Sequence, residues 1–77
     1  MDYRYLESKR DVQGGKVCVK GTRISADLIL EWMSNGANVN DIVTSYPQIS
    51  SEAIAEVLLY ASRIARNEFQ FDSTIAQ

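Results

Sequence analysis

The sequence contains no histidine, one cysteine and one proline, and these scarcities exclude several classes of function. A single cysteine, Cys18, cannot form a disulfide within the chain, and without histidine it cannot complete a structural zinc site. A cysteine nucleophile normally needs a base such as histidine beside it. We therefore expect Cys18 to be a small apolar strand residue. We also expect the chain to have no catalytic residues, no metal and no cofactor.

Long apolar runs are also missing, so no segment is predicted to cross a membrane. The start of the chain lacks the apolar stretch of a signal peptide, and we expect a cytoplasmic protein. With 77 residues, 45% of them hydrophobic, the composition favours one small folded domain. Because a core of this size is marginal and has no disulfide or metal to support it, a homo-oligomer, most simply a dimer, is predicted.

The net charge of −2 is unevenly distributed. Residues 1–23 carry six basic and three acidic side chains, whereas residues 24–77 carry two basic and seven acidic ones. Two interpretations stay open: a basic contact surface at one end of the molecule, or a chance scatter of surface charge.

A β-hairpin is predicted near the N-terminus. Residues 3–10 alternate weakly between apolar and polar, Gly14-Gly15 follows, and residues 16–20 form a second short run. Paired glycines supply the positive φ angles of a tight turn. In the second run Val17 and Val19 share one face, opposite Cys18. Because an isolated hairpin is unstable, one of its faces is expected to rest on helices.

Three helices are predicted after the hairpin. Ser25 is a candidate N-cap for the first, and Gly36 ends it. Asn38 caps the second, with Asp41 in its first turn, and Pro47 stops it. Ser50 or Ser51 caps the third. The predicted apolar faces are Leu28, Ile29, Trp32 and Met33, then Val39, Ile42, Val43 and Tyr46, then Ile54, Val57, Leu58, Ala61, Ile64 and Ala65.

The predicted fold is therefore mainly α: an N-terminal β-hairpin followed by a three-helix, helix-turn-helix-like bundle over residues 1–66, with a C-terminal tail over residues 67–77. The short turn around Tyr46-Pro47 makes the last two helices a helix-turn-helix candidate. Periodicity alone does not separate this from a three-helix bundle with no role in DNA binding.

Several motifs resemble, in order and spacing, those of the family called domain of unknown function 433. They are Gly15-x-Val17, Gly21-Thr22-Arg23-Ile24, Leu30, Gly36, Ile42, Tyr46-Pro47 and Tyr60-Ala61. The resemblance covers roughly residues 9–62. It departs at Val17 and Cys18, where the family more often has proline and a β-branched residue, and at Lys20, where arginine is commoner. It implies a small helix-turn-helix fold and an antitoxin-like role beside a toxin with a PIN-like nuclease domain.

The residues themselves give mixed support for DNA binding. The third helix begins with Ser51 and Glu52 and carries Glu56, and acidic side chains oppose phosphate contacts. Ser50 and Ser51 at its N-terminus remain candidates for one phosphate. The stronger nucleic-acid-binding candidates are the basic side chains of the N-terminal third: Arg4, Lys9, Arg10, Lys16, Lys20 and Arg23.

Other side chains have competing interpretations. Arg23 either contacts phosphate or pairs with Asp27, Glu31 or a backbone carbonyl. Thr22 completes a turn or binds a ligand, and the turn is favoured. Tyr60 is a core residue or part of a dimer interface. In the tail, Phe69, Phe71 and Ile75 are candidate partner-binding residues.

Two functions follow as expectations. The first is an antitoxin-like protein, not an enzyme, that binds a PIN-like toxin and, as an open addition, operator DNA. The second is an interaction or oligomerisation module without DNA binding, which the acidic third helix and the negative net charge favour.

Overall fold

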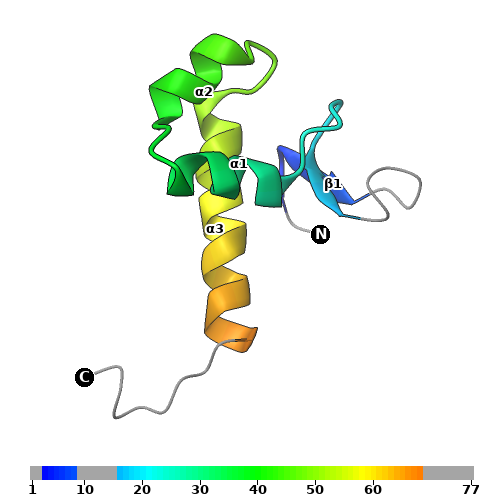
Figure 1. Cartoon of the computed structure of the whole chain (residues 1–77). Helices are drawn as coiled ribbons and strands as arrows, with labels where there is room; N and C mark the ends of the chain where they lie inside the picture. The colour runs from blue at the N-terminus through cyan, green and yellow to red at the C-terminus, as the bar shows by residue number, and fades with distance from the viewer. Residues whose placement is uncertain (1–2, 9–15, 69–77) are drawn as a thin grey trace.

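The computed structural model describes residues 3–8 and 16–68. Two short antiparallel strands, β1 (Leu6–Ser8) and β2 (Val17–Val19), precede three helices, α1 (Ala26–Ser34), α2 (Val39–Ser45) and α3 (Ser51–Glu68). Helix α3 is the long axis of the molecule, α1 crosses it, α2 lies at one end and the hairpin packs to one side (Figure 1). The predicted mainly helical fold, with an N-terminal hairpin and three helices, is confirmed.

The predicted antiparallel hairpin is formed by β1 and β2. Its register pairs Leu6 with Val19 and Ser8 with Val17. Gly14 and Gly15 lie outside the described residues. The hairpin rests on the helices as expected, since β2 contacts α1 and β1 contacts α3. Cys18 and Val19, which alternate along β2, are both buried.

The turn after β2 directs the chain into α1. The hydroxyl of Thr22 donates a hydrogen bond to the Val19 carbonyl at 2.9 Å and accepts one from the Ile24 amide at 3.0 Å. Gly21 has a φ of +77°, which residues with a side chain rarely adopt. Ser25 then pairs with Cys18 in an antiparallel bridge. The structural roles predicted for Gly21 and Thr22 are confirmed.

The predicted helix caps are also present. The Ser25 side chain accepts a hydrogen bond from the Leu28 amide at 3.3 Å. Asn38 and Asp41 form a reciprocal capping box. Gly36, just after α1, has a φ of +106°. The Ser50 side chain accepts from the Ala53 amide at 3.1 Å, so Ser50, rather than Ser51, caps α3.

The core gathers one side chain or more from every element. Its fully buried large members are Leu6, Ile29, Ile49, Ile54 and Val57. Between α1 and α2 the rings of Trp32 and Tyr46 stack in parallel, with centroids 4.9 Å apart and planes at 5°. Both aromatic residues pack against the core, as predicted.

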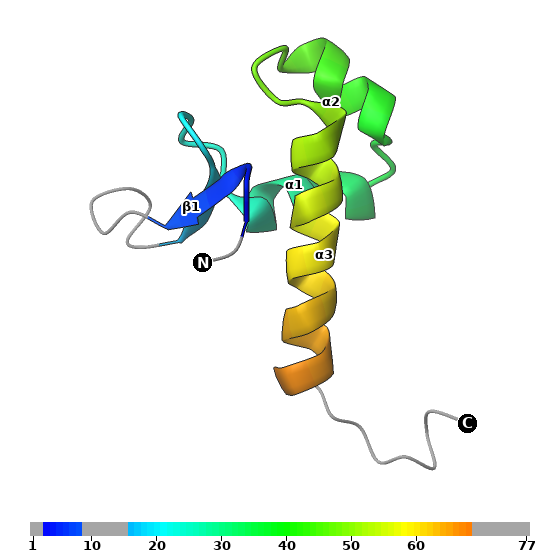
Figure 2. The ribbon, with the colours of Figure 1, turned by 180° about the vertical axis from the view of Figure 1, so that it is seen from behind.

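The fully buried side chains of α3 all come from its first two turns, and Tyr60 packs against the core partly buried. From residue 58 to residue 67 no side chain is fully buried, and the end of the helix extends past α1 and the hairpin (Figures 1 and 2). The predicted apolar stripe was therefore too wide. Leu58, placed on it, is 43% exposed, and Ala65 is exposed as well. None of the described helices is long and apolar enough to span a membrane.

Candidate partner-binding surface

The N-terminal segment is held on α3 by one carboxylate. Glu56 accepts hydrogen bonds from the backbone amides of Arg4, at 2.8 Å, and Tyr5, at 2.9 Å, with a different oxygen for each. Hydrogen bonds to an ionised acceptor are stronger than neutral ones. Glu56 was expected to oppose phosphate binding. In the structure its carboxylate fixes the segment that leads into β1.

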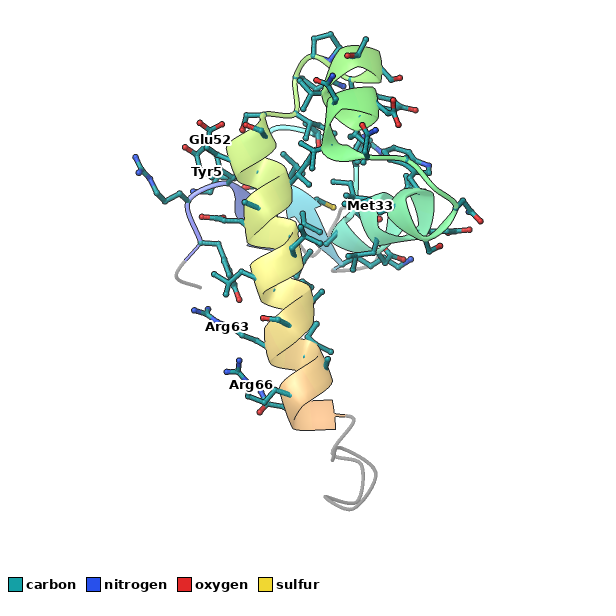
Figure 3. All side chains as sticks on the ribbon, turned by 90° about the vertical axis from the view of Figure 1, so that its left-hand side faces the viewer. Tyr5, Met33, Glu52, Arg63 and Arg66 are labelled. Atoms are coloured by element: carbon teal, nitrogen blue, oxygen red, sulfur yellow. The ribbon has the colours of Figure 1, made fainter. Side chains whose placement is uncertain are left out.

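Aromatic contacts continue this attachment along α3. The ring of Tyr3 meets that of Tyr60 edge to face, with centroids 6.0 Å apart. Arg63 donates a hydrogen bond to the Tyr3 hydroxyl at 3.0 Å and places its guanidinium 5.3 Å from the centre of the Tyr3 ring. Tyr60 therefore has a role inside the monomer, because it supports the N-terminal segment. Figure 3 shows Arg63 along the second half of α3.

Beside these contacts lies an open groove between α1 and α3, with a volume of about 290 Å³. Its surface is mostly apolar, and β2 closes one end. We call it the α1–α3 groove and define it by its lining residues Lys16, Val17, Ala26, Asp27, Leu30, Tyr60 and Ile64. An apolar groove with few charged groups at its edge is typical of a site that receives an apolar side chain or helix from another protein.

A surface ion pair forms the polar edge of the groove. The Lys16 ammonium lies 3.1 Å from the Asp27 carboxylate. A hydrogen bond with the Ser25 side chain, and then the contact with Lys16, lower the pKa of Asp27. Both side chains are more than half exposed, so the pair adds at most about 1 kcal/mol to stability. The groove therefore has a charged edge at neutral pH, but the pair is too exposed to hold the fold together.

Cys18 lies behind this edge, with its side chain buried. Its thiol points to the Lys16 carbonyl at 3.6 Å. Burial, and then the nearby carboxylates of Glu7 and Asp27, raise the pKa of Cys18. A thiol whose pKa is raised is protonated at neutral pH and is a poor nucleophile. This environment matches the apolar strand residue that the sequence predicted.

The structure spreads the predicted nucleic-acid-binding residues over several surfaces. Lys20 and Arg23 are exposed on the turn after β2, where the Glu7 carboxylate accepts from the Gly21 amide at 3.0 Å. Arg4 is exposed beside α3, while Lys16 pairs with Asp27. Ser50 caps α3, and the Ser51 hydroxyl lies 3.3 Å from a Glu52 carboxylate oxygen. Lys9 and Arg10 lie outside the described residues.

The basic surface is therefore interrupted by acidic groups. Glu7 lies within the basic N-terminal third and Asp27 lies just after it. Both carboxylates stand among the basic side chains of that third. Neutralising phosphate charge is what gives nucleic-acid binding most of its affinity. The interruptions weaken the case for an extended phosphate-binding face among residues 3–8 and 16–23.

A second, smaller hollow of about 210 Å³ lies between α1 and α2, next to the stacked rings of Trp32 and Tyr46. Its one charged side chain, Asp41, already belongs to the capping box of α2. Over residues 3–8 and 16–68, no three histidine, cysteine, aspartate or glutamate side chains are grouped so as to hold a metal ion.

The glycine turn, the Thr22 hydrogen bonds and the Tyr46-Pro47 turn after α2 stand where the sequence motifs lie. Residues 7–61 match the model of the family described as protein of unknown function DUF433. The chain belongs to the DUF433 family. The match covers most of the described residues, including every helix up to Ala61, and agrees closely with the extent expected from the motifs.

A solved DUF433 structure has the same fold. The crystal structure of a DUF433 member protein from Anabaena variabilis ATCC 29413 superposes with a TM-score of 0.73 at 25% sequence identity. The alignment covers 95% of this chain and 69% of the other. Among curated proteins, none matches this DUF433 chain significantly.

The sequence did not predict the contacts that shape the candidate surface. Glu56 contacts residues more than fifty positions earlier, and no local pattern signals such a contact. Leu30 and Ile64 were recognised as a motif residue and a core residue, but their meeting in the groove depends on how α1 crosses α3. Phe69, Phe71 and Ile75, the predicted partner-binding residues, lie outside the described residues.

Proposed function

We propose that this DUF433 protein is an antitoxin-like binding protein that takes up a PIN-like nuclease toxin through the α1–α3 groove. The observation that carries this function is the groove itself. It is open, mostly apolar, and lies beside the half of α3 that the core leaves uncovered. A folded monomer gains nothing from leaving such a surface in water, whereas a partner gains affinity by covering it.

The role of a binding protein, with no catalysis of its own, agrees with the chemistry of the described side chains. The buried Cys18 thiol has a raised pKa, and the Glu56 carboxylate is engaged by two backbone amides. An inhibitory partner needs only surface and charge complementarity, and the groove and its Lys16–Asp27 edge offer both.

Binding of operator DNA has less support in the structure than binding of a toxin. Its support is the exposed position of Arg4, Lys20 and Arg23. Against it are the acidic groups among the same residues and at the start of α3. A mobility-shift assay at low salt, with the DNA upstream of the gene, separates an antitoxin that also binds its operator from an interaction module without DNA binding.

The tail is the second candidate contact with the toxin, because it follows directly from the uncovered half of α3 and contains Phe69, Phe71 and Ile75. We expect a chain ending at Glu68, which keeps every described element, to keep its helical circular dichroism. We expect the same chain to lose copurification with a PIN-like protein encoded beside its gene. A shortened chain that copurifies as well as the full chain removes the tail from the binding site, and the groove is then tested alone.

A further inference from the structure

The face of α3 that points away from the core carries a second surface, distinct from the groove. At 100° per residue, it spans about 100° of the helix surface, and its centre lies about 140° around the helix from the centre of the buried residues Ala53, Ile54 and Val57. Its members are all exposed, and they include the two exposed large hydrophobic residues of the described chain, each 43% exposed. We call it the outer stripe: Ala55, Leu58, Leu59, Ser62 and Arg66.

One side of α3 is covered by no other helix or strand when the molecule is seen from behind (Figure 2), and the exposure of all five members places the stripe on uncovered helix surface. The stripe follows the spacing of three and four residues that keeps one helix face against another. Ala55 and Ser62 are small, and they flank the two leucines on either side. Small flanking residues allow two helix backbones to approach closely around a central apolar contact.

The charged residues near the two ends of the stripe indicate which partner molecule packs on it. Glu52 precedes the midpoint between Leu58 and Leu59 by about 10 Å of helix, and Arg66 follows it by about 11 Å. Figure 3 shows Glu52 near the start of α3 and Arg66 near its end. The stripe is therefore apolar at its centre and basic at one end, and Glu52 lies beside its other end at a nearly equal distance, about 70° around the helix from the centre of the stripe. Such a surface is complementary to itself when turned by a half rotation.

We propose that a second copy of this chain packs its α3 antiparallel against the outer stripe, about a twofold axis between Leu58 and Leu59. This arrangement places the leucines of the two copies together and Ala55 opposite Ser62 of the second copy. It also brings Glu52 within one turn of Arg66 of the second copy, and symmetry repeats the pair. A parallel arrangement instead places Glu52 near Glu52 and Arg66 near Arg66, which repel.

The dimer does not depend on the toxin-binding function, because the groove residues Tyr60 and Ile64 lie on the other side of α3. The positions of the charges along α3 select a second copy as the partner of the outer stripe. The α1–α3 groove stays open in both copies. Packing of the two α3 helices buries apolar side chains that each monomer leaves exposed, which helps a domain with a small core.

Charge reversal tests the dimer by sedimentation equilibrium of the full chain over a wide concentration range. We expect Glu52→Arg and Arg66→Glu each to weaken dimerisation by about tenfold, since two attractive pairs become repulsive. The double variant Glu52→Arg/Arg66→Glu restores the pairs with their signs exchanged, and we expect it to recover most of the wild-type association. Glu31→Arg, an exposed position on α1, makes the same change in net charge as Glu52→Arg and leaves dimerisation unchanged.

Leu59→Glu provides a second test, because it places a charge at the centre of the interface on an exposed position. We expect this variant to be monomeric, with wild-type circular dichroism. A wild-type chain that stays monomeric at every concentration overturns the proposal. So does a dimer whose dissociation constant is unchanged by both single charge reversals, or a double variant no tighter than the weaker single one.

Discussion

Replacing Ile54 by alanine is expected to lower the free energy of unfolding by about 3–4 kcal/mol. Ile54 is fully buried on the core side of α3, in the cluster that also contains Ile29 and Val57. Removing buried carbons loses their transfer free energy and leaves a cavity that the neighbours fill only in part. A domain of this length has roughly 4–12 kcal/mol of stability in total, so the variant is expected to lose a large share of it.

Urea denaturation followed by circular dichroism measures this loss, at high dilution so that self-association does not contribute. Leu59→Ala is the matched control. It removes the same number of carbons from the same helix, but from a side chain that is 43% exposed. We expect the control to change stability by less than about 1 kcal/mol. Equal losses for the two variants contradict the assignment of the core to one face of α3.

Replacing Glu56 by alanine is expected to lower the free energy of unfolding by about 2 kcal/mol. The change removes both acceptors of the Arg4 and Tyr5 amides, and the Tyr5 amide is partly buried. Because these bonds attach the segment that leads into β1, the loss is expected to be local as well as global. Hydrogen exchange at the amides of Arg4 and Tyr5 measures the local part, and urea denaturation measures the global part.

Glu56→Gln keeps one acceptor oxygen, and we expect it to lose about half as much stability as the alanine variant. Glu31→Ala removes an exposed carboxylate from α1 and serves as the control for the change in charge. If Glu56→Ala exchanges its Arg4 and Tyr5 amides no faster than the wild type, Glu56 does not hold the N-terminal segment.

Local signals predicted most of the elements. Ser25, the Asn38–Asp41 capping box and the positive φ of Gly36 mark helix ends with chemistry that acts within a few residues. Thr22 and Gly21 likewise fix a turn from their own side-chain and backbone properties. Because such features need no distant partner, they are visible in the sequence.

Long-range relations were harder to predict. The apolar pattern of α3 was taken as one stripe, although Leu58 lies outside the core, because hydrophobicity does not say which apolar residue finds a neighbour. The hairpin register and the cover over Cys18 depend on how β1 and the turn at Ser25 flank β2. The groove arises where α1 crosses α3, which no segment specifies alone.

The most direct test of the α1–α3 groove is the dissociation constant between this DUF433 protein and a purified PIN-like protein encoded beside its gene. Ile64→Asp places a carboxylate in the groove, and we expect the complex to weaken by at least about 100-fold, because the charge must be desolvated on binding. Thr44→Asp adds the same group at an exposed position on α2 and is expected to leave binding unchanged. A complex of wild-type affinity with Ile64→Asp contradicts the groove as the binding site, and no complex with the wild type contradicts the antitoxin-like function.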